Sequence, residues 1–180
     1  MRFLNYLRLL LLGVWLGAAV FFIGVAQSAF ALLPTRELAG SIVNRNLMFL
    51  NLAGLGIGVL LILLSLVAAR NSNRALLWAE RFFLFVLAGA CAVGQFVIAL
   101  WLQLTKAQMG GVPIDQVAVD DPLRVQFNAI HEYSVWVLAA GMFAALVAFF
   151  VAAFRHSATG GSGSATTSDP FDFSKEFKKT

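Results

Sequence analysis

Charged residues are scarce in this sequence. They make up 12% of the 180 residues, whereas 60% of the chain is hydrophobic. Soluble domains carry about 25% charged residues, so the composition excludes an ordinary soluble protein and indicates an integral membrane protein. The net charge of +4 comes from Lys and Arg scattered at the ends of apolar runs. That distribution is typical of membrane flanks and lacks the basic stripe that tracks nucleic-acid phosphates.

Cysteine and histidine are also nearly absent. The single cysteine, Cys91, excludes an intramolecular disulfide. His156 follows His131 by 25 residues, or about 37 Å along one helix, which excludes bis-histidine haem. A zinc site needs three or four Cys, His or carboxylate ligands, and only His131 and Glu132 are adjacent, on diverging sides of a helix. Because no phosphate loop or nucleophile–base motif is visible either, we expect no enzymatic activity and no metal site.

Four long apolar segments make up most of the chain. They cover about residues 9–33, 47–69, 76–104 and 126–154. Each segment is long enough to cross a bilayer, which takes about 20 residues. We therefore expect an all-α, four-transmembrane-helix bundle in residues 1–156. Residues 157–180 are expected to form a flexible tail, whose Phe/Lys-rich end either contacts anionic lipid or a cytoplasmic partner or is simply disordered.

The first apolar segment has a second interpretation. Ala29-Phe30-Ala31 has the small-x-small form of a signal-peptide cleavage site. The segment is much longer than a signal core of about 7–15 residues, however, so an uncleaved helix is the prediction. Pro34 then disfavours helix at the residue before it, and residues 41–46 are expected to form an interfacial turn before the second span.

Basic residues predict the orientation. With the N-terminus inside, the inner segments hold Arg2, Arg8, Arg70, Arg74, Arg81, Arg155 and the three tail lysines, and the outer segments hold Arg36, Arg45, Lys106 and Arg124. An excess of Lys and Arg marks the cytoplasmic side. We therefore expect both termini in the cytoplasm, with the bacterial inner membrane as the location.

Small residues recur on one face of several spans. The expected helix-packing glycines are Gly13, Gly17, Gly24, Gly54, Gly58 and Gly141. Glycine lets two helix backbones approach closely. Close packing favours helix association in lipid, where the hydrophobic effect does not drive helices together.

Polar side chains gather toward the outer ends of the spans. The candidate site residues are Gln27, Ser28, Asn44, Asn51, Gln103, Asn128, His131 and Ser134. Two interpretations stay open. One is a pocket in which His131 binds a proton, a small polar ligand or, as a single axial ligand, a haem or pigment. The other is a hydrogen-bonded layer that fixes the helices in register. The sequence itself requires no cofactor.

Two motifs carry a resemblance. Phe30-x-x-Leu33-Pro34-Thr-Arg-x-x-Ala-Gly40 joins the first two spans, and Phe127-x-x-x-His131-x-x-Ser134 follows Asp121-Pro122. With four spans and a long third loop, the chain resembles the bacterial membrane proteins of the domain-of-unknown-function 4149 group, which resemble eukaryotic transmembrane protein 205. The resemblance implies a four-helix membrane protein and leaves its activity open.

Two classes of function follow from these features. The small-residue faces favour a non-catalytic accessory or scaffold subunit that packs against other membrane subunits or against itself. The polar residues around His131 favour a ligand-handling membrane protein, with a pigment or haem, a quinone or lipid, or a transported small molecule as its ligand. No nucleic-acid partner is expected.

Overall fold

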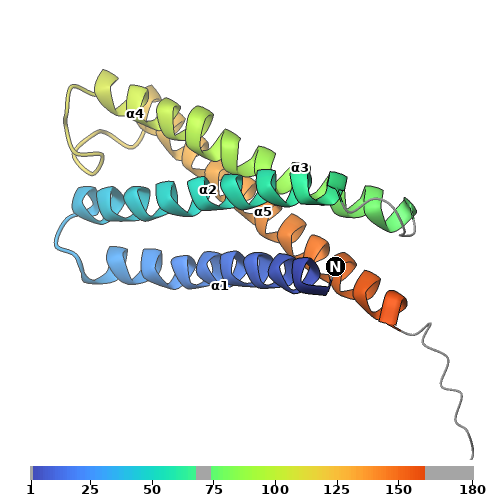
Figure 1. Ribbon diagram of the computed structural model, residues 1–180. Helices are drawn as coiled ribbons and strands as arrows, with labels where there is room; N and C mark the ends of the chain where they lie inside the picture. Colours follow the sequence, from blue (N-terminus) through green and yellow to red (C-terminus); the bar gives the residue numbers. More distant parts are fainter. Residues whose placement is uncertain (1, 68–73, 161–180) are drawn as a thin grey trace, which may run out of the picture.

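The computed structural model describes residues 2–67 and 74–160, and all the regular structure in these ranges is helical (Figure 1). The elements are α1 (Arg2–Leu32), α2 (Arg36–Val67), α3 (Arg74–Ala92), the π-helix η2 (Val93–Ile98), α4 (Ala99–Gln108) and α5 (Pro122–Gly160). The elements α3, η2 and α4 follow one another without a break. Within the described ranges, four helical stretches are long and apolar enough to cross a membrane. The predicted all-α bundle of four long apolar helices is therefore confirmed.

The helix starts follow from local capping. Asp121 Oδ1 accepts a hydrogen bond from Leu123 N at 2.8 Å, as expected for an Asp cap before Pro122. Thr35 Oγ1 accepts one from Leu38 N at 3.3 Å and starts α2 at Arg36. The prediction of an interfacial turn at residues 41–46 is therefore wrong. Helix α2 already starts at Arg36, and these residues belong to it.

The last helix is longer than its apolar run. Helix α5 continues to Gly160, so the first residues expected in the flexible tail are helical. The rest of that tail, with its Phe/Lys-rich end, lies outside the described residues.

The helices form an elongated bundle with two distinct ends (Figure 1). Helices α1 and α2 lie side by side and run in opposite directions, and α5 crosses the other helices obliquely. The α1–α2 connection and the α4–α5 loop meet at one end, which we call the loop end; the N-terminus lies at the opposite end, toward which α5 runs. The most extensive contacts join α3 to α5 and α2 to α3.

Trp15 is the largest side chain of the core, and it is 1% exposed. Its Nε1 donates a hydrogen bond to Leu50 O at 3.0 Å. Gly54 lies beside this indole, since a Cβ at Gly54 would come within 2.5 Å of Trp15 Nε1 and 2.6 Å of Cys91 Sγ. Helices α1, α2 and α3 thus meet at a point where only a glycine fits.

The other predicted packing glycines divide into two groups. A Cβ at Gly58 would lie 3.0 Å from Ala88 Cβ, one at Gly141 3.3 Å from Ala90 Cβ, and one at Gly13 3.7 Å from a ring carbon of Phe149. These three therefore lie at helix contacts. By contrast, Cβ atoms at Gly17 and Gly24 would have no neighbour within 4 Å, so these two positions on α1 face outward.

The outward surface of the bundle is apolar. Phe21, Trp136 and Phe143 are each more than 60% exposed, and other large hydrophobic side chains accompany them along all the helices. Soluble proteins rarely expose so large an apolar surface to water. A lipid bilayer would cover it.

Candidate functional site

A cavity of about 420 Å³ lies at the loop end of the bundle. Residues from the starts of α2 and α5, from α4, from the loop at residues 109–115 and, at the end of α1, Phe30 line it. Pockets for small ligands typically enclose about 300–1,000 Å³. The cavity is therefore large enough for a small organic molecule.

Basic side chains surround the outer part of this cavity. Arg36, Lys106 and Arg124 all contribute to its lining. Arg36 Nε lies 3.6 Å from Asp115 Oδ1 in an ion pair that is well exposed, and Lys106 Nζ lies 5.7 Å from the centre of the Phe127 ring. Arg124 Nη1 donates a hydrogen bond to Val117 O and so ties the loop to α5. Glu37 and Asp115 also line the cavity, so its charged rim has three basic and two acidic side chains, with a net charge of +1, and Arg124 attaches it to the loop.

Amides and the histidine form the next layer inward. Asn44 on α2, Gln103 on α4, and Asn128 and His131 on α5 all line the same cavity. His131 is exposed, so its imidazole is accessible from the cavity. With Ser134, which also lines the cavity, the structure thus brings together five of the eight candidate residues named from the sequence, and they come from three different helices.

The floor of the cavity is apolar apart from Ser134. Leu47, Ala99 and Leu102 line it. Ser134 Oγ donates to the carbonyl of His131 at 2.6 Å, within its own helix. The cavity therefore changes from charged at its rim, through polar, to apolar at its base.

A second, much smaller cavity of about 20 Å³ continues from the same region. It shares Asn44 and Ser134 with the large cavity and adds Asn51 and Gly94. About 10–15 Å³ of such volume holds one water molecule. Gly94 belongs to the π-helix, and a Cβ there would lie 3.1 Å from Asn51 Nδ2. The wide turn of η2 thus brings backbone close to the Asn51 amide.

Three polar residues near this region do not join either cavity. Gln27 and Ser28 on α1 are exposed, and Ser28 Oγ donates to Gly24 O of its own helix at 2.8 Å. Glu132 is exposed and also lies outside both linings. Helix α1 therefore contributes no amide to the polar layer. In the described ranges, no group of three His, Cys, Asp or Glu residues is placed to hold a metal ion.

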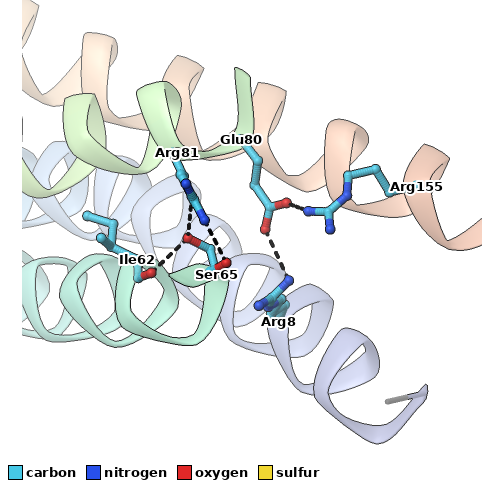
Figure 2. Close-up of polar contacts among 6 residues, drawn as sticks. All are labelled: Arg8, Ile62, Ser65, Glu80, Arg81 and Arg155. Atoms are coloured by element: carbon cyan, nitrogen blue, oxygen red, sulfur yellow. Dashed lines mark hydrogen bonds and ion pairs between the residues drawn. The ribbon is translucent and has the colours of Figure 1, made fainter. Parts of the chain in front are cut away.

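The structure brings together a group of charged side chains at the opposite end that the sequence does not predict (Figure 2). Glu80 on α3 lies between Arg8 on α1 and Arg155 on α5. Arg8 Nη1 is 3.5 Å from Glu80 Oε1, and Arg155 Nη1 donates to Glu80 Oε2. Arg8 and Glu80 are each 2% exposed, and the Arg155 side chain is 11% exposed.

Arg81 completes this group. Its Nε donates to Ser65 Oγ at 3.1 Å and its Nη2 to Ser65 O at 2.9 Å, while Ser65 Oγ donates to Ile62 O at 2.7 Å (Figure 2). We call Arg8, Glu80, Arg81 and Arg155 the arginine cluster. One signal in the sequence indicates this cluster. Glu80 is an acid on the second turn of an otherwise apolar helix, and such an acid needs a basic partner. In a four-helix bundle of alternating direction, Arg8 and Arg155 lie at the same end as Glu80.

Comparison with known proteins finds no matching family model, curated protein or solved structure. The resemblance to the domain-of-unknown-function 4149 group therefore stays a prediction.

Proposed function

We propose that this protein is a non-catalytic, ligand-handling membrane protein, and that the cavity around His131 takes a small amphipathic molecule. The observation that carries the proposal is the order of lining side chains along α2, α4 and α5: charged residues with a net positive charge near the loop end, then amides and the imidazole, and then apolar residues further along each helix. A molecule with an apolar body and a polar or anionic end satisfies all three layers at once.

Each layer would contribute a different part of the binding. The apolar floor gains about 25 cal/mol for every Å² of apolar surface that it removes from water. The amides of Asn44, Gln103 and Asn128 offer both donors and acceptors, and the His131 imidazole adds its two ring nitrogens. The net charge of +1 at the rim favours an anionic over a cationic group there. A quinone or a lipid-like amphiphile fits this pattern better than an inorganic ion does.

The proposal includes an orientation. The loop end faces away from the cytoplasm if both termini lie inside, as the distribution of Lys and Arg predicts. The cavity would then open at the outer boundary of the bacterial inner membrane, where an amphiphile can enter with its polar end toward water. Cysteine accessibility at Val119, which is exposed on the loop, tests this orientation in intact cells.

Binding is tested with one substitution and one matched control. His131→Ala removes a cavity-lining side chain, whereas Glu132→Ala changes the next residue, which is exposed and outside the lining. We expect native mass spectrometry of the protein purified in mild detergent to show a bound quinone or lipid that His131→Ala reduces about tenfold and Glu132→Ala leaves in place. Equal occupancy in both variants, or an empty wild-type protein in the presence of added ubiquinone and lipid, would contradict the proposal.

A second candidate function is an accessory or scaffold subunit. The outward-facing Gly17 and Gly24 on α1 favour it, because small residues at an open helix face allow another transmembrane helix to approach closely. We expect Gly17→Leu to release a co-purifying membrane partner or a second copy, and Gly56→Leu, at another open position on α2, to have no such effect. A protein that migrates as a lone monomer before any substitution would count against this candidate.

A further inference from the structure

The arginine cluster contains more positive than negative charge. Arg8, Arg81 and Arg155 face a single carboxylate, that of Glu80. Within the described helices no other acid is available to balance them: α1 has none, α2 has only Glu37 and α5 has only Glu132. Glu37 lines the cavity at the loop end, and Glu132 neighbours His131 on the same side of the bundle. Among the four side chains of the arginine cluster, positive charges therefore outnumber negative charges by two.

One member of the cluster also has unused hydrogen-bond donors. Nη1 of Arg8 points to Glu80, whereas its Nε and Nη2 have no hydrogen-bond partner in the part of the chain that the structure describes. Arg8 is nevertheless 2% exposed. Buried polar groups are normally paired, and a buried charge without full pairing is strongly unfavourable. The side chain is thus placed as if to meet an additional acceptor.

The position of the cluster along the bundle restricts what that acceptor is. Arg8 and Glu80 each follow the start of their helix by six residues, or about 9 Å. Helix α1 is about 46 Å long, compared with about 30 Å of hydrocarbon, so it extends about 8 Å beyond the hydrocarbon at each end when centred. The cluster then lies at the boundary where lipid phosphates are found. Exposed Trp78 and Phe154 lie beside it in the sequence, as aromatic residues at such boundaries do.

We infer that the arginine cluster binds a phosphate anion through the free donors of Arg8, with Arg155 at the accessible side. Guanidinium groups bind phosphate with two parallel hydrogen bonds, and more strongly than neutral donors do. The anion would compensate the excess charge and would join α1 to α5 at the end remote from the His131 cavity. The same chemistry is offered by the headgroup of an anionic phospholipid and by free inorganic phosphate.

The test compares three protein variants and three additives. Wild type, Arg8→Gln and Arg36→Gln are purified in mild detergent and given phosphatidylglycerol, phosphatidylcholine or inorganic phosphate. Retention is measured by native mass spectrometry, and stability by thermal unfolding. Arg36 is the matched control, because it is an exposed arginine at the opposite end.

We expect wild type and Arg36→Gln to retain phosphatidylglycerol in preference to phosphatidylcholine, and Arg8→Gln to lose this preference by about tenfold, since one charge-assisted hydrogen-bonding group is removed. A matching rise in unfolding temperature with inorganic phosphate alone would identify the soluble anion as the source. A shift with phosphatidylglycerol alone would identify the lipid. No preference in wild type, or the same preference in Arg8→Gln, would overturn the inference.

A second variant keeps the inference testable if Arg8→Gln does not fold. Glu80→Gln removes the carboxylate that competes with the anion for both guanidinium groups, so we expect anion retention to increase. A cluster that serves only to hold α1, α3 and α5 together predicts the opposite result, namely weaker packing with unchanged or lower retention of phosphatidylglycerol.

Discussion

Replacing Gly54 with alanine tests the packing of the bundle at its tightest point. The added methyl group would lie 2.5 Å from Trp15 Nε1 and 2.6 Å from Cys91 Sγ, well inside contact distance. Trp15 and Cys91 are 1% and 3% exposed, so neither side chain has open space into which it can move. The indole also donates its hydrogen bond to Leu50 O on the helix that carries Gly54. Helix α2 must therefore separate from α1, from α3 or from both.

The expected cost is the sum of two effects. Overpacking a well-filled core costs about 1–3 kcal/mol. Losing the Trp15–Leu50 hydrogen bond adds about 0.6–2 kcal/mol in a membrane protein. Alanine also has a higher helix propensity than glycine, by up to about 1 kcal/mol, which partly offsets the loss. We therefore expect Gly54→Ala to lower the free energy of unfolding by about 1–4 kcal/mol.

A control in the same helix separates packing from helix propensity. Gly56 stands two residues further along α2, and a Cβ there would meet nothing within 4 Å. Gly56→Ala therefore gains the propensity of alanine without a clash. Unfolding in mixed micelles with increasing dodecyl sulfate, followed by circular dichroism and tryptophan fluorescence, measures both variants. If Gly54→Ala were as stable as Gly56→Ala, the close approach of α1, α2 and α3 described above would be wrong.

Two further predictions concern single side chains. Cys91 is buried among the helices. We therefore expect a maleimide reagent to leave Cys91 unlabelled in the folded protein and to label it fully after unfolding. Rapid labelling in mild detergent would show that α3 is not packed as described. The side chains of the Arg36–Asp115 ion pair are 71% and 46% exposed. We therefore expect Asp115→Asn to lower the free energy of unfolding by less than about 1 kcal/mol. A larger loss in the same unfolding assay would mean that this pair anchors the loop.

The helical architecture could be predicted from the sequence because it depends on composition and length alone. Four apolar runs of sufficient length leave few alternatives to helices, since every backbone group must be paired within its own segment in lipid. Capping residues such as Asp121 can also be predicted from the sequence. The cap accepts a hydrogen bond from a backbone N–H only two or three residues away, so it does not depend on the rest of the fold. The early start of α2 at Arg36 is harder to predict, because the polar residues after Pro34 resemble a loop and only the Thr35 cap marks the helix start.

The composition of the candidate site was only partly predictable. Asn44, Gln103, Asn128 and His131 come together as their positions near helix ends suggested. Gln27 and Ser28 do not, because which face of α1 meets the bundle depends on how Trp15 and Leu12 pack, and a helical period alone does not decide it. The arginine cluster is not predictable for a related reason. The positions of Arg8 and Arg155 near helix ends are typical of membrane flanks, and their burial depends on the packing of α1, α3 and α5 around Glu80.

The π-helix has a consequence for insertions and deletions. In η2 the chain makes a wider turn than an α-helix, with Ala99 N–H bonded to Gly94 O, five residues back. Deleting one residue between Val93 and Ile98 would restore an uninterrupted α-helix. Gln103 and Lys106 would keep nearly their present direction, because the π-turn closes over about the same angle as an α-turn that is one residue shorter. Deleting one residue from the regular helix between 74 and 92 would instead rotate the part that lines the cavity by about 100° relative to the residues before the deletion. The span therefore tolerates the loss of a residue in η2 better than a loss elsewhere along its length.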